Sequence, residues 1–282
     1  SLISEKDAAL YGDLESMIPA LNPLNKDNST LRPSLLHGFM KSASYNFNRK
    51  ASGVRFFEVG HVFNKDEEGT YYKGIKEEVH VLFGLAGMKH TDSWSKEAES
   101  YSVFDLKALV NALFTKLNLI DHISSNASDA ETLDYYWGDV KLGSLSIPAN
   151  DLKKSYGFEQ DAFVAELSVS AIAEALRVIP ERKFKAVPKF PAFEFDFAVI
   201  VPQVVTAGAL MNVIKDKAGD QLESIDIFDV FEGKSIGEGN KSLAFRLQFL
   251  DPNKTLNIKE VEPIIQRIVK SLEKDFSAKL RG

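Results

Sequence analysis

The sequence contains no cysteine, which excludes disulfide bonds, thiolate catalysis and cysteine-ligated zinc together. No apolar run approaches the roughly 20 residues that a membrane-spanning helix needs. A basic surplus is missing too, because 34 Lys and Arg stand against 40 Asp and Glu, a net charge of −6 that is unusual for a stand-alone nucleic-acid binder. The 44% hydrophobic and 26% charged residues are ordinary globular values, and 282 residues is enough for two domains.

Common catalytic and metal-binding motifs are also absent. The histidines are scattered, with no His-Glu-x-x-His motif and no carboxylate at ligand spacing, so we expect no metal site. They are His37, His61, His80, His90 and His122. The sequence has neither a serine nucleophile elbow nor a phosphate-binding G-x-x-x-x-G-K-[ST] loop. We therefore predict no catalytic residue in this chain.

The stretch from Ile225 to Leu256 predicts two antiparallel strands joined by a glycine-rich turn. The segments IDIFDVF and SLAFRLQF alternate in the manner of strands, and Gly233, Gly237 and Gly239 lie between them. Around this hairpin we expect a strand at 193–201, helices at 206–218 and 258–275, and a short strand at 277–281. That order is the βαββαβ motif of a ferredoxin-like domain, a fold that by itself says nothing about function.

The preceding part of the chain predicts a helix followed by a long hairpin. Ser34 can cap a helix that runs to about Asn48. We then expect a strand at 54–63, a polar turn at 66–69, a strand at 80–87 and a helix at 103–117, with further strands and a short helix within 132–148 and 162–176. The proline-rich run at 178–193 is the predicted linker. We place the domains at 1–187 and 188–282.

Several motifs resemble one known family. KFPAFEFDFAVIV, ESIDIFDVFEG, GNKSLAFRLQFLDPNKTL and the terminal LRG are similar, in this order, to the ferredoxin-like anticodon-binding domain of bacterial phenylalanyl-tRNA synthetase β subunits. NPLNKDNSTLRPSLLHGFMKSASYNFNR and RFFEVGHVF resemble the catalytic-like module of the same subunit. The resemblance implies an α+β fold, in which a class II synthetase-like antiparallel sheet with flanking helices precedes a ferredoxin-like βαββαβ domain.

The function that this resemblance implies is that of an ATP-dependent ligase joining phenylalanine to its tRNA. The parent enzyme would be a cytoplasmic (αβ)₂ heterotetramer, without a membrane part, that binds tRNA(Phe) and uses ATP and Mg²⁺. Its active site would lie in the α subunit, and no cofactor is expected in this chain. The sequence begins at Ser1 without an initiator methionine, so we expect a C-terminal fragment of the β subunit.

The class II-like core is expected to be catalytically silent. Active members carry an Arg two residues before a Glu on the second-motif strand, because cationic side chains stabilise the charge on the ATP phosphates. Phe56 stands at that position before Glu58, and Arg55 is shifted by one residue, which turns its side chain to the opposite face of a strand. The counterpart of the third motif has no Arg until Arg177. We expect this core to serve as a scaffold and as a surface for the α subunit.

The anticodon site follows from the resemblance residue by residue. It implies Phe231 as a ring on which a base stacks, Asp229 as the acceptor for a guanine edge, and Ser242 as a hydrogen-bond partner. Asp229 and Phe231 lie two residues apart, so both project from one face of a strand. The family more often has Tyr where this chain has Phe231, so stacking is kept while a hydroxyl contact is lost. Lys241 and Arg246 are candidate phosphate contacts, with ordinary surface solvation as the alternative for each.

Alternatives to this interpretation stay open at the level of sequence. Phe231 can instead be an inward-facing core aromatic, although Phe228 and Val230 compete for the same core and alternation puts Phe231 on the face opposite Val230. Residues 188–282 carry 13 Lys and Arg against 14 Asp and Glu, a net charge of −1, so no strong non-specific grip on phosphates is expected. A regulatory small-molecule-binding module on a ferredoxin-like fold is the alternative function, and an autonomous class II ligase is a third.

Overall fold

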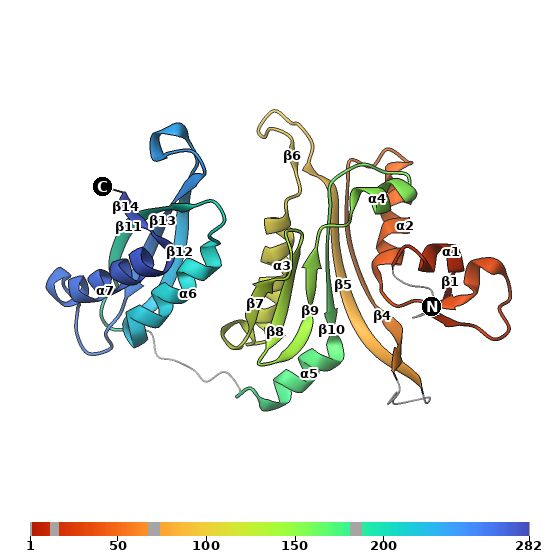
Figure 1. The fold of residues 1–282 in the computed structure, drawn as a ribbon, viewed down its shortest axis with the longest axis horizontal. Coiled ribbons are helices and arrows are strands. Elements are labelled where there is room, and N and C mark those ends of the chain that lie inside the picture. Colours follow the sequence, from red (N-terminus) through yellow and green to blue (C-terminus); the bar gives the residue numbers. More distant parts are fainter. Residues whose placement is uncertain (1, 12–16, 67–73, 181–187, 282) are drawn as a thin grey trace. The chain divides into compact units, whose positions relative to one another are not determined.

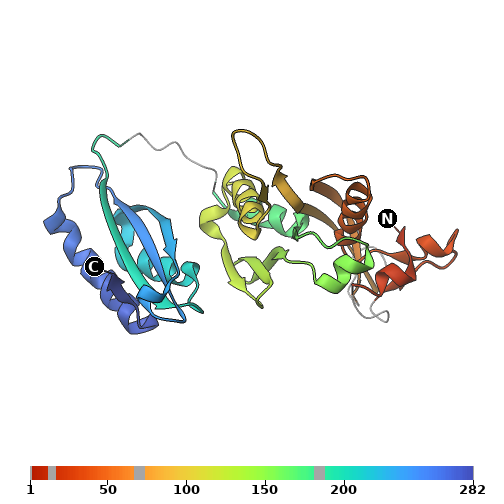
Figure 2. The same ribbon diagram turned by 90° about the horizontal axis from the view of Figure 1, so that it is seen from above.

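The computed structural model describes residues 2–11, 17–66, 74–180 and 188–281 (Figures 1 and 2). The chain divides into two compact units, residues 1–183 and 184–282. Two predicted features lie outside the described residues, namely positions 67–69 of the polar turn and positions 181–187 of the linker. Among the described helices, none is both long and apolar enough to cross a membrane.

The N-terminal unit is built on a seven-stranded sheet with the strand order β4-β5-β10-β9-β8-β7, and β6 pairs with β5 outside this path. All of these pairings are antiparallel. The strands are β4 (Gly53–Asp66), β5 (Gly74–His90), β6 (Glu99–Ser100), β7 (Ser124–Ala127), β8 (Thr132–Trp137), β9 (Val140–Ser146) and β10 (Ala162–Ser168). The β4–β5 hairpin is longer than predicted, because pairing of the two backbones continues beyond the apolar residues that mark each strand in the sequence.

Smaller elements precede and connect these strands. A three-stranded sheet at the N-terminus has the order β1-β3-β2. The elements are β1 (Leu2–Ile3), α1 (Glu5–Ala8), β2 (Ile18–Pro19), a 3-10 turn (Lys26–Asn28), β3 (Thr30–Leu31), a second 3-10 turn (Ile120–His122) and α4 (Asn150–Ser155).

Three helices cover the two faces of the large sheet: α2 (Leu36–Phe47), α3 (Val103–Lys116) and α5 (Val169–Val178). Because side chains alternate along β5, Leu82 enters the cluster that includes Phe39 of α2, while Leu85 enters the cluster that includes Phe114 of α3. An antiparallel sheet with helices on both faces is the arrangement predicted for this part of the chain (Figure 1).

The start of α2 is fastened to the sheet by a carboxylate. Ser34 Oγ accepts the N–H of Leu36 at 3.0 Å and donates to Glu166 Oε2 at 2.5 Å. Glu166, on β10, also accepts the N–H of Leu35 at 3.1 Å, and its Oε1 lies 2.9 Å from Nδ1 of His80 on β5. Ser34 was predicted as the cap, but Leu35 occupies the cap position of α2, and the Ser34 hydroxyl lies one residue before it, bound to a glutamate far away in the sequence.

The C-terminal unit has the predicted βαββαβ order. Its elements are β11 (Phe193–Pro202), α6 (Ala207–Ala218), a 3-10 turn (Gly219–Gln221), β12 (Leu222–Phe231), a 3-10 turn (Lys234–Ile236), β13 (Asn240–Phe249), α7 (Ile258–Phe276) and β14 (Lys279–Arg281). The strands form one antiparallel sheet in the order β12-β13-β11-β14. This sheet and its two helices confirm the predicted ferredoxin-like half of the α+β fold.

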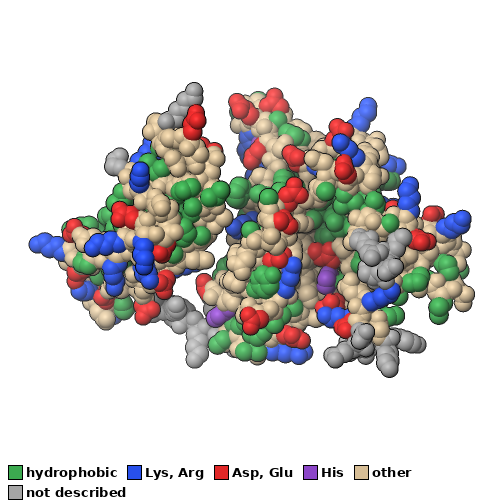
Figure 3. All heavy atoms as spheres, in the orientation of Figure 1, with side chains coloured by type: hydrophobic (Ala, Val, Ile, Leu, Met, Phe, Trp, Pro, Cys, Tyr) green, Lys and Arg blue, Asp and Glu red, His purple; other side chains and the backbone are tan. Residues whose placement is uncertain are grey.

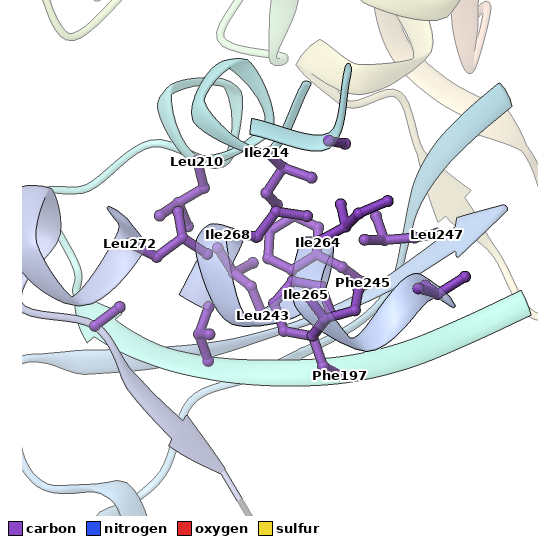
Figure 4. Close-up of a cluster of buried hydrophobic side chains, with 14 of the residues drawn as sticks. Phe197, Leu210, Ile214, Leu243, Phe245, Leu247, Ile264, Ile265, Ile268 and Leu272 are labelled. Carbon is purple, nitrogen blue, oxygen red and sulfur yellow. The ribbon is translucent and has the colours of Figure 1, made fainter. Parts of the chain in front are cut away.

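Both helices of this unit lie on the same face of its sheet. Leu210 and Ile214 of α6 and Ile268 of α7 pack against Leu243 and Phe245 of β13 in one buried cluster (Figure 4). Within the described part of this unit, the opposite face of the sheet has no helix over it. That open face is where the predicted site residues must be sought.

Candidate nucleic-acid interface

The alternation of β13 defines which residues lie on the open face of the C-terminal sheet. Phe245 and Leu247 are 0% exposed in the core below the helices. Ser242 and Arg246 lie at the intervening positions, so their side chains project to the open face. Directly opposite residues in antiparallel strands share a face, which makes β13 a reference for its two neighbours.

A β-bulge decides where the site residues of β12 point. Ile225 is opposite Leu247, and Ile227 is opposite Phe245, so both isoleucines face the core. The register then shifts between Ile227 and Asp229, leaving Phe228 as the extra residue. Beyond the shift, Asp229 is opposite Ala244 and Phe231 is opposite Ser242, on the open face.

Phe231 is a partly exposed ring and lies outside the hydrophobic core. It is 36% exposed, and the guanidinium carbon of Arg281 lies 4.9 Å from its ring centroid. Gly233 approaches the tip of the ring so closely that an added Cβ would lie 2.7 Å from Phe231 Cζ. Ser242, directly opposite Phe231, is only 2% exposed. The structure therefore brings Asp229, Phe231 and Ser242 together on one face.

Arg246 also lies on the open face, but its guanidinium already has a partner. Its Nε and Nη2 donate to the two carboxylate oxygens of Asp196 at 2.9 and 2.6 Å. These bonds hold the pKa of Asp196 below its usual range, and the same carboxylate raises the pKa of Arg246. The guanidinium carbon also lies 5.2 Å from the ring centroid of Phe228. Arg246 is thus committed to two neighbours on this face.

Lys241 is separated from the other four predicted site residues. It pairs with Val201, a residue 1% exposed in the core, and so belongs to the helix-covered side of the sheet. Its Nζ donates to the carbonyl oxygen of Gln203 at 2.9 Å. Lys241 and Ser242 are consecutive strand residues, so they project to opposite faces, and Lys241 does not share a face with Phe231.

Sequence reasoning did not single out Arg281, whose guanidinium the structure places beside the Phe231 ring. Arg281 pairs with Ala198, which in turn pairs with Ala244, so all three lie on the open face with Asp229. The available signal was the arginine of the terminal LRG motif at the end of the last strand. Its place near Phe231 depends on the strand order, which puts β14 and β12 at the two edges of one four-stranded sheet.

Charges of both signs are interspersed on the visible surface of the C-terminal unit (Figure 3). On the open face, the carboxylates of Asp196, Asp226 and Asp229 lie among the guanidinium groups of Arg246 and Arg281. Such a surface does not offer phosphates a uniform positive field. It is better suited to stacking and to hydrogen bonds with base edges.

The predicted silent position in the N-terminal unit is filled by a hydrophobic contact. Phe56 packs against Phe39 of α2 with ring centroids 5.9 Å apart, and Arg55 points to the opposite face of β4. Glu58 is bound to Arg32, whose Nη1 lies 2.6 Å from Glu58 Oε1. Within the described ranges, no group of three or more His, Asp or Glu side chains could hold a metal ion.

Comparison with known proteins agrees with both units. Residues 1–169 match the phenylalanyl tRNA synthetase beta chain CLM domain, and residues 188–281 match the ferredoxin-fold anticodon binding domain. This chain belongs to the phenylalanine–tRNA ligase beta subunit family.

Named relatives support this membership along the whole chain. The phenylalanine–tRNA ligase beta subunit of Bacillus licheniformis is 35% identical over 100% of this chain and 35% of its own length. The Bacillus subtilis subunit is 32% identical over the same shares, and that of Bacteroides thetaiotaomicron is 30% identical over 97% of this chain and 35% of its own. The chain thus spans about a third of the length of these beta subunits. A solved pyrrolysyl tRNA synthetase of Desulfitobacterium hafniense superposes with a TM-score of 0.45 at 14% identity, over 62% of this chain and 60% of that chain.

Proposed function

We propose that this chain is the C-terminal part of the β subunit of a phenylalanine–tRNA ligase, and that residues 188–282 bind the anticodon of tRNA(Phe). The observation that carries the proposal is the open sheet face. There the partly exposed ring of Phe231 lies beside Asp229 and Ser242, in a unit that matches an anticodon-binding domain. Unpaired bases are read by stacking on such rings and by hydrogen bonds to their edges.

The three residues have complementary roles in this proposal. Phe231 supplies the ring on which the first anticodon base stacks, a contact of about 1–3 kcal/mol. The carboxylate of Asp229 accepts hydrogen bonds but cannot donate them when ionised. An ionised carboxylate therefore suits the N–H groups of guanine. Guanine is the first base of GAA, the common anticodon for phenylalanine. Ser242 offers a hydroxyl below the ring.

The chemical step belongs to another subunit in this proposal. The enzyme joins phenylalanine to its tRNA with ATP and Mg²⁺, and the catalytic α subunit holds these reactants. The N-terminal unit acts as a scaffold and a surface for α within a cytoplasmic (αβ)₂ assembly, with the domain boundary at residues 187 and 188. Phe56 supports this division. It stands where active members carry the cationic side chain that ATP phosphates require, and its ring packs against Phe39 instead.

The test is Phe231→Ala in the ligase assembled with its α subunit. We expect kcat/KM for tRNA charging to fall by about 10-fold or more, as the loss of one stacked base implies. Phenylalanine activation, measured by pyrophosphate exchange, should hold. Phe231→Tyr should charge normally because it keeps a ring.

A matched control is Val230→Ala. Val230 is on the same strand and is also exposed, at 56%, but its side chain projects to the opposite face of the sheet. If Phe231→Ala charges tRNA at the wild-type rate, the assignment of Phe231 as the anticodon-stacking ring is wrong. Pyrophosphate exchange by this chain without α would instead favour an autonomous ligase.

A further inference from the structure

We propose that Phe228 is a second base-stacking position, which takes the base following the one on Phe231 in the same single strand. This inference rests on the proposed anticodon function and extends it by one residue and one base. Its basis is the β-bulge in β12, the contact between Phe228 and Arg246, and the carboxylates around them.

A large apolar side chain lies at the bulge of β12. Phe228 is the extra residue between Ile227 and Asp229, and it is 53% exposed. Bulges are used in sheets to re-aim a side chain, often beside functional sites. Without the extra residue, the alternation that begins at Ile225 would carry Asp229 and Phe231 into the core. One local irregularity therefore presents Phe228, Asp229 and Phe231 to the same side.

Each of the two rings is accompanied by an arginine. The guanidinium carbon of Arg246 lies 5.2 Å from the ring centroid of Phe228, and that of Arg281 lies 4.9 Å from the ring centroid of Phe231. Arg246 is held in place by its two hydrogen bonds to Asp196, so the contact with Phe228 has a fixed support. Two ring–guanidinium pairs thus occur on one sheet face.

The two rings lie along one strand of a four-stranded sheet. Phe228 and Phe231 are three residues apart on one strand, which corresponds to about 10 Å along it. Other RNA-binding modules stack two or three bases on the aromatic rings of a single four-stranded sheet. The sheet of this unit is also four-stranded, and both rings lie on its open face.

The charges around Phe228 indicate which base it takes. Asp226 lies opposite Arg246, and Asp229 follows Phe228 directly, so carboxylates flank the ring. Carboxylates repel phosphates and accept hydrogen bonds from exocyclic amino groups. The position therefore favours a base with an exocyclic amino group and disfavours uracil. Adenine is the second base of the anticodon GAA.

The test combines a protein change with a tRNA change in the assembled ligase. We expect Phe228→Ala to lower kcat/KM for charging tRNA(Phe) transcripts by about 10-fold, the loss of one stacked base. With uracil in place of the second anticodon adenine, the same substitution should cost less than 3-fold, because little stacking is left to lose. Phe228→Trp should charge the normal transcript well. In a transcript with the fluorescent base 2-aminopurine at the second anticodon position, stacking should quench the fluorescence when wild-type enzyme or Phe231→Ala binds. Binding of Phe228→Ala should leave this fluorescence unquenched.

Controls separate this inference from the proposed function. Val230→Ala, equally exposed on the opposite face, should behave as wild type, and Phe231→Ala should lose charging with either transcript. If Phe231→Ala impairs charging but Phe228→Ala does not, the second position is wrong and the anticodon site stands. An equal loss from Phe228→Ala on both transcripts would overturn the inference as well. If neither substitution affects charging, both proposals fail.

Discussion

The guanidinium carbon of Arg281 lies 4.9 Å from the centroid of the Phe231 ring, although the two residues belong to opposite edge strands of the sheet. Between these strands, Ser242 lies directly opposite Phe231 and is 2% exposed. A base can reach the Ser242 hydroxyl only when the side chains around it move. We therefore expect Arg281 to adjust when RNA binds and to contact the stacked base from the other side.

Replacement of Arg281 by leucine should weaken charging modestly. A cation beside an exposed ring contributes about 0.5–1 kcal/mol, so Arg281→Leu should lower kcat/KM for tRNA by about 2–5-fold. Phenylalanine activation should not change, and Arg281→Lys should fall between the two. Charging kinetics of the assembled ligase provide the measurement. A rise in tRNA affinity would contradict this expectation and show that Arg281 obstructs the site.

Gly233 offers a way to move the Phe231 ring without removing it. The backbone of Gly233 is not in the left-handed region, so alanine meets no conformational penalty there. Its Cβ would lie 2.7 Å from the tip of the Phe231 ring, which must tilt away. Because the ring is partly exposed, stability should change little, while charging should fall by about 3–10-fold, part of one stacking contact.

The matched control for this substitution is Gly208→Ala in α6, where an added Cβ meets nothing within 4 Å. Both variants should give wild-type urea melting curves, and only Gly233→Ala should lose charging. Equal kinetics of the two variants would mean that the position of the ring is unimportant.

The free energy of unfolding of the N-terminal unit should depend on pH because of the Asp105 carboxyl group. The Lys89 ammonium, with Nζ 2.8 Å from Asp105 Oδ1, and the hydrogen bonds donated by the hydroxyl and the N–H of Ser102 hold the pKa of this carboxyl at about 2. A depressed pKa stabilises the fold above the unfolded value near 3.8, and the contribution is lost as pH falls through about 2. Asp105→Ala should therefore cost about 1 kcal/mol at pH 7, because the capping box with Ser102 loses one of its two halves.

The measurement is urea unfolding followed by tryptophan fluorescence, since Trp94 and Trp137 both lie in the N-terminal unit. The difference between wild type and Asp105→Ala should shrink between pH 4 and pH 2. Glu174→Gln, an exposed carboxylate on α5, serves as the control and should show no such convergence. A difference that stays constant across this range would refute the role of Asp105.

The regular elements of the C-terminal unit were predictable because their signals are local. The helix expected at 206–218 is α6 at Ala207–Ala218, with Thr206 as its cap, and the strand expected at 193–201 is β11 at Phe193–Pro202. The last strand begins at Lys279 instead of 277. Ser277 takes a left-handed backbone conformation with a φ of 54° that ends α7, and the strand begins only after it.

The position of Lys241 on the face opposite Ser242 could also have been predicted from the sequence. Lys241 and Ser242 are neighbours in a strand, and neighbouring residues project to opposite faces whatever the rest of the fold does. The contact of Arg281 with Phe231 could not have been predicted in this way. It depends on β14 and β12 belonging to one sheet, which is a matter of long-range pairing.

The amino-acid sequence alone determined which side chains are available, the order of strands and helices, and the family to which they belong, because these follow from local patterns and motifs. The tertiary structure alone decided which face of the sheet carries Asp229 and Phe231. Simple alternation groups them with Ile225 and Ile227, which face the core. The bulge at Phe228 reverses that assignment, and a bulge exists only through the pairing of β12 with β13, two strands whose register no single segment specifies.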